Sequence, residues 1–295
     1  MEIFFFILLG ACVGILSGYF GIGGGFVLTP ILLLMGLSPI VAIATSLLFT
    51  IGTSFSGIIA HFRMKNIEFK TGMVIALSGL VATQLAHPFV MLLKNLNIEE
   101  IAIPVFYILL AGYFAYTLLT HKKKEANTEV KTRNTWLAPL LIGLAGGFIS
   151  TTLGVGGGFI IVPLLISFVG LQPRKAVGTS LFAVLFIVIA GFITYSTSIS
   201  IDYPFAFTLI AGALIGGQLG AYLTRIFKDA EIKKFLGFLY VFTVINMVLK
   251  ISGFSMVGLT ISLGYIGFLL VVFTLRTIHY FKQKKNEMNT RGEAS

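Results

Sequence analysis

Two glycine-rich segments contain the residues of this sequence that are best suited to chemistry. Residues 21–25 read Gly-Ile-Gly-Gly-Gly and residues 154–158 read Gly-Val-Gly-Gly-Gly; a phenylalanine follows each, and a proline comes four residues after it. Glycine adopts dihedral angles closed to other residues and leaves its backbone N–H uncovered. At the start of a helix such N–H groups attract anions, and the helix dipole adds to the attraction. The sequence therefore predicts an anion site formed by Gly21, Gly23, Gly24, Gly25, Gly154, Gly156, Gly157 and Gly158.

Hydroxyl and amide side chains recur at matching places behind the two glycine segments. A Thr-Ser pair lies six to seven residues into the next helix on each side, which is about 10 Å along it. Hydroxyl groups at that depth can donate to an oxyanion, although in membrane helices they also bond to preceding carbonyls of their own helix. A glutamine follows later in each copy and adds amide donors. The predicted substrate-binding side chains are therefore Thr45, Ser46, Gln84, Thr179, Ser180 and Gln218.

The composition excludes a soluble globular protein. Of the 295 residues, 57% are hydrophobic and only 11% are charged, and the mean hydropathy is +0.98. The expected fold class is an all-α polytopic membrane protein in a lipid bilayer. The net charge of +10 resides in short loops and the tail, which predicts no nucleic-acid partner. The single cysteine, Cys12, excludes an internal disulfide and a multi-cysteine metal site, and we expect no metal and no cofactor.

The sequence is duplicated. The glycine segment, its phenylalanine and its proline recur 133 residues later, and after one inserted residue the match continues at an offset of 134. At this second offset Pro39 aligns with Pro173 and Gly57 with Gly191. With this shift of one residue, the match between the two copies extends over residues 21–85. Such a match predicts two structural repeats with the same succession of helices.

Each repeat is predicted to contain five hydrophobic segments, of which the second is too short to cross a membrane. Repeat one, residues 1–120, has segments at 3–20, 26–37, 38–61, 70–93 and 100–120. A polar linker at 121–136 precedes repeat two, residues 137–250, with segments at 137–153, 159–170, 173–197, 203–226 and 231–250. The short segments rise about 18 Å against a hydrocarbon core of about 30 Å, so the glycine hinges are expected near mid-membrane. A further span at 251–281 precedes a charged tail, 282–295, that we expect to be disordered.

Loop charges predict that the two repeats have opposite orientations in the membrane. The loop after residue 61 carries Arg63, Lys65 and Lys70, whereas its counterpart at 196–203 has no basic residue. Because basic residues mark cytoplasmic loops, we expect the N-terminus outside, and the linker and the C-terminus inside. Inverted repeats are typical of secondary transporters with alternating access to a midplane site. A channel that uses the same anion site is the alternative.

Two other interpretations start from the same residues. Gly-Thr-Ser at 52–54 and at 178–180 suggests an intramembrane serine protease, but a nucleophilic serine needs a nearby histidine. Residues 137–250 contain no histidine, so we predict that the chain is not an enzyme. Glycines at four-residue spacing, at 10, 14 and 18 and at 212, 216 and 220, are interpreted as helix-packing faces, which could also serve a homo-oligomer.

The paired motifs resemble one known family. The duplicated Gly-x-Gly-Gly-Gly-Phe with its proline, followed by Pro-x-x-Ala-x-x-Thr-Ser-Leu from Pro39 and from Pro173, is similar to the sulfite exporter TauE/SafE family, also called the 4-toluene sulfonate uptake permeases. The resemblance covers nearly the whole chain, residues 5–275. It implies a transporter of the bacterial or archaeal cytoplasmic membrane, with small sulfur-containing anions such as sulfite, sulfoacetate and other organosulfonates as substrates. Only the second copy carries the basic pair Arg174-Lys175, which predicts an asymmetric site if these charges act in binding.

Overall fold

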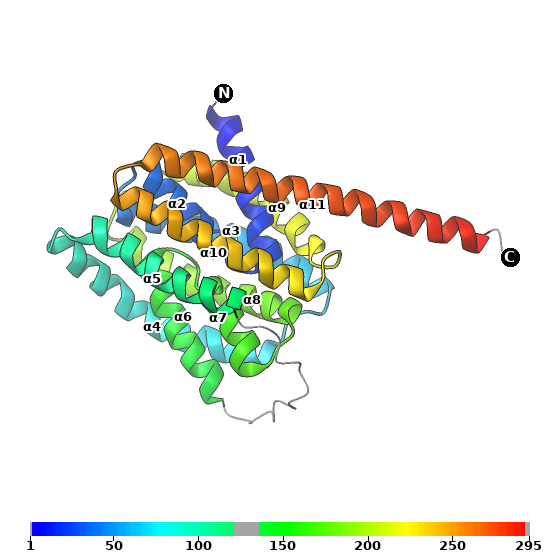
Figure 1. The fold of residues 1–295 in the computed structure, drawn as a ribbon. Coiled ribbons are helices and arrows are strands. Elements are labelled where there is room, and N and C mark those ends of the chain that lie inside the picture. The colour runs from blue at the N-terminus through cyan, green and yellow to red at the C-terminus, as the bar shows by residue number, and fades with distance from the viewer. Residues whose placement is uncertain (1, 121–135, 293–295) are drawn as a thin grey trace.

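The structure is a computed structural model, and it describes residues 2–120 and 136–292. Within these residues every regular element is a helix (Figure 1). Eight of the described helices are long and apolar enough to cross a membrane: α1 (Glu2–Phe20), α3 (Pro39–Arg63), α4 (Phe69–Asn95), α5 (Glu99–Thr120), α8 (Pro173–Ser196), α9 (Tyr203–Leu223), α10 (Asp229–Ile251) and α11 (Ser255–Gly292). The shorter ones are α2 (Gly25–Leu34), α6 (Leu137–Leu153), α7 (Gly158–Leu164) and the π-helix η1 (Leu165–Val169) that continues α7. The predicted fold class, an all-α polytopic membrane protein, is confirmed.

The two short helices behind the glycine hinges are α2 and the continuous α7–η1 helix. A glycine with left-handed backbone follows each of these helices, Gly36 at φ 92° after α2 and Gly170 at φ 76° after η1. The chain turns at these glycines toward Pro39 and Pro173. The π-helical turn η1 lies where the sequence offset changes from 133 to 134. A π turn takes in one extra residue without ending the helix, so it explains how the second copy accommodates its insertion.

Each repeat packs its first helix against the fourth helix of the other repeat, α1 along α9 and α6 along α4. A Cβ added at Gly14 would lie 2.8 Å from the backbone of Ala213, and one at Gly18 would lie 2.1 Å from the Gly217 carbonyl oxygen. The residue numbers rise together along the contact, so α1 and α9 run parallel. The glycines at four-residue spacing therefore allow close approach of two backbones, as the sequence indicated.

The third helices of the two repeats, α3 and α8, form the centre of the bundle and are mostly buried. Gly57 of α3 faces Leu181 of α8, and Gly191 of α8 faces Leu47 of α3. The residue numbers rise on one helix as they fall on the other. The two helices, which occupy equivalent places in the repeats, therefore run antiparallel.

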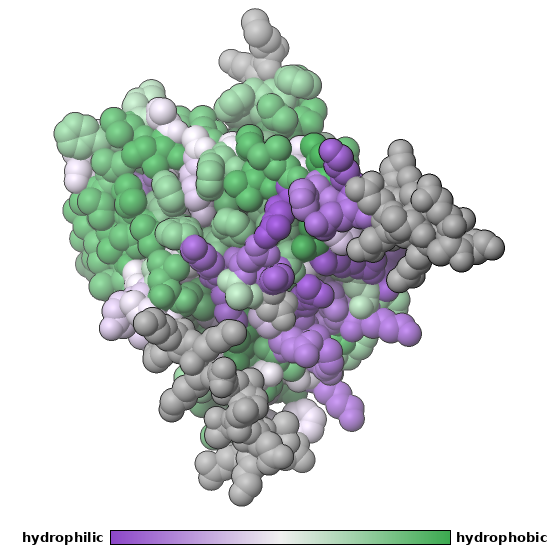
Figure 2. Space-filling model, turned by 45° about the vertical axis from the view of Figure 1, so that its right-hand side comes forward, coloured by the Kyte–Doolittle hydropathy of each residue, from purple (hydrophilic) through white to green (hydrophobic). Residues whose placement is uncertain are grey.

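The loops rich in basic residues gather at one end of the bundle. Lys175 Nζ, at the start of α8, lies 2.6 Å from Oε1 of Glu68 in the loop before α4. Arg174 donates to the Phe227 carbonyl, in the loop before α10, at 3.0 Å. Figure 2 shows hydrophilic residues collected over one region of the surface, with hydrophobic residues over most of the remaining described surface in that view. These contacts bring together the loops that the sequence predicts to be cytoplasmic.

Three features of the chain differ from the expected boundaries or lie outside the description. The helix α11 continues to Gly292, so the expected disorder is wrong for residues 282–292, where Lys, Gln, Glu and Met favour a helix. The helix α9 ends at Leu223, three residues early, because Thr224 bonds to the Ala221 carbonyl through both its N–H and its hydroxyl. The predicted linker lies, apart from Trp136, outside the described residues.

Candidate functional site

The two glycine hinges meet in the middle of the bundle. Residues 21–25 and 154–158 are all buried. A Cβ added at Gly25 would lie 2.1 Å from the Gly154 carbonyl oxygen, and one at Gly158 would lie 2.4 Å from the Gly21 carbonyl oxygen. Positive φ angles of 67° to 78° occur at Gly21, Gly23, Gly154, Gly156 and Gly157. Close contact and backbone conformation thus both require glycine, and the structure brings the predicted glycines together.

Aromatic rings pack where the two half-helices begin. Phe26 and Phe159, which follow the two hinges, stack with their ring centroids 4.7 Å apart. Tyr240 packs edge-on against Phe26 and donates its hydroxyl to the Phe159 carbonyl. That carbonyl lacks its usual helical partner because Pro163 has no N–H. Tyr107 of α5 donates to the last carbonyl of α6, that of Leu153, at 2.9 Å, so both tyrosines hold the backbone close to the second hinge.

The N–H groups at the start of α2 are hydrogen-bonded within the protein. The Gly25 N–H donates to Thr50 Oγ1 at 2.8 Å, and the Gly24 N–H donates to Thr53 Oγ1 at 3.2 Å. Both threonines belong to α3, and the Thr50 hydroxyl itself donates to the Ser46 carbonyl at 2.7 Å. An anion would have to displace these hydroxyls to reach the N–H groups of Gly24 and Gly25, whereas those of Ile22 and Gly23 make no hydrogen bond within the described residues.

The N–H groups of the second hinge lack such acceptors. At the positions equivalent to Thr50 and Thr53, α8 carries Val184 and Ile187, which have no acceptor atoms in their side chains. Val184 Cγ1 would lie 3.2 Å from a Cβ added at Gly156, so valine occupies the place that threonine has in repeat one. Within the described residues, no hydrogen bond is made by the N–H groups of Gly156, Gly157, Gly158 and Phe159. Buried N–H groups without a partner are rare in proteins. These four donors are therefore the part of the site where we most expect a ligand to bind.

A buried hydroxyl lies beside these donors. Ser150 of α6 is fully buried, and its Oγ has no hydrogen-bond partner among the described residues. Its Cβ would lie 3.1 Å from a Cβ added at Gly157. The equivalent residue of repeat one, Ser17, is also fully buried without a partner for its hydroxyl. The second hinge therefore combines several unused N–H donors with one unused hydroxyl.

The predicted Thr-Ser pairs occupy different places. Ser180 donates to the Gly21 carbonyl at 3.1 Å and so lies at the first hinge. Thr179 accepts a hydrogen bond from the Glu68 N–H at 2.9 Å, at the basic end of the bundle. Thr45 and Ser46 are buried in α3, and the Ser46 hydroxyl has no hydrogen-bond partner in the described part of the chain. Of the four residues, only Ser180 bonds directly to a hinge.

The predicted glutamines are not brought to the hinges. Gln84 of α4 and Gln218 of α9 are exposed, and they are followed by Leu85 and Leu219, which are also exposed. The inward faces of these helices consist of small residues such as Gly79 that pack on the neighbouring helix. The two glutamines keep equivalent positions in the repeats but point away from the centre.

The Gly-Thr-Ser segments do not form a serine–histidine pair within the described residues. Ser180 donates to a backbone carbonyl, and the Ser54 hydroxyl has no partner. The buried His61 has Nε2 3.4 Å from the Gly18 carbonyl oxygen and Nδ1 3.3 Å from the Asn66 side-chain nitrogen. This histidine therefore links α3 to the end of α1 rather than to a serine.

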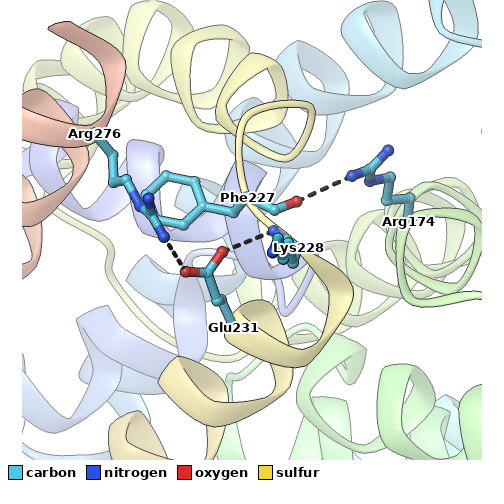
Figure 3. A network of polar contacts seen from close by, with 5 residues as sticks. All are labelled: Arg174, Phe227, Lys228, Glu231 and Arg276. Atoms are coloured by element: carbon cyan, nitrogen blue, oxygen red, sulfur yellow. Dashed lines mark hydrogen bonds and ion pairs between the residues drawn. The ribbon is translucent and has the colours of Figure 1, made fainter. Parts of the chain in front are cut away.

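A polar network connects the loop before α10 with α8 and α11 (Figure 3). Glu231, at the start of α10, accepts a hydrogen bond from the Lys228 N–H at 2.9 Å and pairs with Arg276 of α11. The neighbouring Phe227 accepts from Arg174 of α8 through its carbonyl, and its ring packs on Tyr19 of α1. The network ties α8, α10 and α11 together at the basic end of the bundle.

Sequence reasoning missed four residues of the hinge region. Ser17 and Ser150 could have been found, because the offset of 133 aligns them. Thr50 and Thr53 gave no such signal, because the repeat is broken there by Val184 and Ile187. The asymmetry between the hinges thus appears only when the backbone donors are matched to their acceptors.

The helix order and the paired hinges can now be compared with known proteins. A model of the family described as sulfite exporter TauE/SafE matches residues 6–247. The chain belongs to this family. The TauE/SafE match spans both hinges, both central helices and the crossed pairs of first and fourth helices.

Individual relatives share a quarter to a third of their residues with this TauE/SafE chain. A probable membrane transporter protein of Bacillus subtilis, YjnA, is 28% identical over 234 residues, which are 77% of this chain and 92% of the relative. One from Haemophilus influenzae is 29% identical over 266 residues, 83% of this chain and 97% of the relative. MJ0441 of Methanocaldococcus jannaschii, also a probable membrane transporter protein, is 32% identical over 199 residues, 65% of this chain and 72% of the relative. No solved structure matches significantly. The chain is therefore a multi-pass membrane protein of a transporter family.

Proposed function

We propose that this protein is a secondary transporter that moves small anions, with sulfite and organosulfonates as the leading candidates, across the cell membrane by alternating access at the paired hinges. The observation that carries the proposal is the row of unbonded N–H groups from Gly156 to Phe159 beside the unbonded Ser150 hydroxyl. Such groups at the start of a helix bind oxyanions. The helix Gly158–Val169 also presents the positive end of its dipole there.

The proposed site is asymmetric. The second hinge supplies the donors, whereas the first hinge, with its N–H groups bonded to Thr50 and Thr53, closes the site from the other side. Sulfite and sulfonate groups carry three oxygens, so one anion can accept from several donors in a row. Ser180, which donates to the Gly21 carbonyl of the first hinge, is close enough to join the site when the hinges separate. Gln84 and Gln218 are not included.

Alternating access is supported by the relation between the repeats. Equivalent helices α3 and α8 run antiparallel, and the first helix of each repeat packs on the fourth helix of the other. Inverted repeats would produce this arrangement, with the N-terminus outside and the linker and the C-terminus in the cytoplasm. The hinges are fully buried against one another. This closed state favours a transporter with gates over an open anion channel.

Uptake into proteoliposomes tests this proposal. The purified chain is reconstituted and offered labelled sulfite, with sulfate, a short organosulfonate or acetate as competitor, with and without an imposed pH gradient. We expect saturable uptake that sulfur oxyanions block more strongly than acetate does. Flux that rises linearly with concentration would favour the channel, and absence of flux from folded protein for every anion would overturn anion transport.

A further inference from the structure

A long apolar groove runs between α10 and α11 on the outside of the bundle. It has a volume of about 670 Å³, and five of its lining residues are aromatic. Phe242 and Tyr265 stack with their centroids 3.9 Å apart and form its inner wall, while Phe238 and Phe268 are 39% and 57% exposed. Both helices are candidate membrane spans, so the groove opens toward the hydrocarbon of the bilayer.

The length of the groove matches one leaflet. On α10 the lining residues extend from Glu231 to Phe242, a rise of about 16 Å at 1.5 Å per residue. One leaflet contributes half of a hydrocarbon core of about 30 Å. The groove therefore begins at the basic end of the bundle and stops near the middle of the membrane, which is the reach of one acyl chain.

Among the described residues that line the groove, one is basic, Lys234 at its mouth. The Glu231 carboxylate already has hydrogen-bond and ion-pair partners, because it accepts from the Lys228 N–H and pairs with Arg276 (Figure 3). Lys234, one turn further along α10, is exposed and forms no ion pair with any described residue; its Nζ lies over the Phe238 ring at 5.9 Å. A basic residue at the membrane surface attracts anionic lipid head groups. The other side-chain donor of the aromatic part of the groove, the Tyr265 hydroxyl, donates to the Phe235 carbonyl at 3.4 Å, so this part suits an acyl chain better than a small substrate anion.

We propose that this groove binds one anionic phospholipid from the leaflet at the basic end, with its phosphate at Lys234 and one acyl chain along the aromatic wall. The chain would end near Gly264, where an added Cβ would meet no atom within 4 Å. The lipid would fasten α11 to α10. It would thereby support α2, because Gly258 of α11 packs on Leu34 of that half-helix.

Lipid binding is tested on the full-length chain, purified in detergent, with phosphatidylglycerol and phosphatidylcholine of identical acyl chains. Native mass spectrometry counts the retained lipids, and the thermal unfolding midpoint is measured with each lipid. We expect one retained phosphatidylglycerol, a midpoint several degrees higher with it than with phosphatidylcholine, and at least fivefold weaker retention in Lys234→Gln.

Two glycine substitutions distinguish lipid binding in the groove from binding elsewhere on α11. Gly264→Leu places a side chain in the groove and is expected to abolish retention of the lipid. Gly267→Leu, where an added Cβ also meets no atom within 4 Å but which does not line the groove, is expected to retain it like the wild type. Equal retention of both lipids by the wild type, equal retention by the two leucine variants, or a lipid-free dimer would overturn the proposal. Anion uptake is not part of this readout, so failure here leaves the proposed function standing.

Discussion

At the scale of single residues, the two hinges differ by a few side-chain oxygens. Thr50 and Thr53 satisfy N–H groups at the first hinge, whereas Val184 and Ile187 leave those of the second without acceptors. A hydrogen bond to a charged group contributes about 1.5–3 kcal/mol. A row of unused donors can therefore supply much of the affinity for a small anion, and a hydroxyl that fills it can remove that affinity.

Replacement of Ser150 tests the hydroxyl beside the second hinge. Ser150→Ala removes an oxygen that bonds to no described residue, so the fold should keep its stability. If this hydroxyl donates to the anion, its loss removes a hydrogen bond worth about 1.5 kcal/mol or more. Since about 1.4 kcal/mol corresponds to a tenfold change, the sulfite concentration for half-saturation of uptake should rise roughly tenfold. The matched control is Ser17→Ala at the equivalent place in repeat one, where we expect less than a twofold change. Equal effects of the two variants would contradict the asymmetry.

Replacement of Thr50 tests the bonds that already fill the first hinge. Thr50→Val leaves the buried Gly25 N–H without its acceptor, which costs about 1–3 kcal/mol. We expect a lower thermal unfolding midpoint of the detergent-solubilised protein. Thr274→Val is the control, because that threonine is exposed and bonds only to a carbonyl of its own helix; its midpoint should not change. A midpoint of Thr50→Val equal to that of the wild type would show that the bond to Gly25 does not stabilise the hinge.

At the scale of the elements, glycine faces hold the two repeats together. The contact of α1 with α9 has no room for a side chain at Gly18, whose added Cβ would lie 2.1 Å from a carbonyl oxygen. The contact of α4 with α6 is built in the same way, with a Cβ at Gly147 lying 2.3 Å from the Gly79 carbonyl oxygen. Helices in lipid associate through such close packing, so these faces set the distance between the repeats.

A single alanine checks this packing. Gly18→Ala should separate α1 from α9 and lower the unfolding midpoint, because forcing extra atoms into a packed interface costs about 1–3 kcal/mol. Gly267→Ala on α11 meets no atom within 4 Å and should leave the midpoint unchanged or raise it slightly, since alanine favours helix over glycine. An unchanged midpoint in Gly18→Ala would mean that the two helices can move apart at little cost.

The sequence predicts the helices better than the directions in which they face. Most boundaries lie within a few residues of the expected ones, because each span is a long apolar run that ends at charged, proline or glycine residues. The exposed positions of Gln84 and Gln218 could not be predicted, because an almost wholly apolar helix carries no pattern that fixes its rotation about its axis. The π-helical turn could not be predicted either, although its position follows from the inserted residue.

At the scale of the whole molecule, the two repeats enclose the hinges between them. The contacts place the basic loops of both repeats at one end, through Glu68 with Lys175 and through Arg174 with Phe227. If that end is cytoplasmic, the equivalent loop at 196–203, which has no basic residue, lies on the other side of the membrane.

Cysteine labelling tests this orientation. In a Cys12→Ser background, the exposed positions Lys70 and Ser200 are changed separately to cysteine and treated in intact cells with a reagent that does not cross the membrane. We expect labelling of Ser200→Cys from outside, and labelling of Lys70→Cys only after the cells are opened. Labelling of both cysteines from the same side would exclude inverted repeats.

Sulfite uptake by the Val184→Thr variant tests whether the N–H groups of the second hinge bind the anion. Threonine has nearly the shape of valine and would give the second hinge the hydroxyl that Thr50 gives the first. One of the donors that we assign to the anion, the Gly158 N–H that is equivalent to that of Gly25, would then be satisfied by the protein itself. We predict that the variant folds with an unfolding midpoint equal to or higher than that of the wild type, while saturable uptake in proteoliposomes falls at least tenfold. Wild-type uptake by a folded Val184→Thr protein would contradict an anion site at the second hinge.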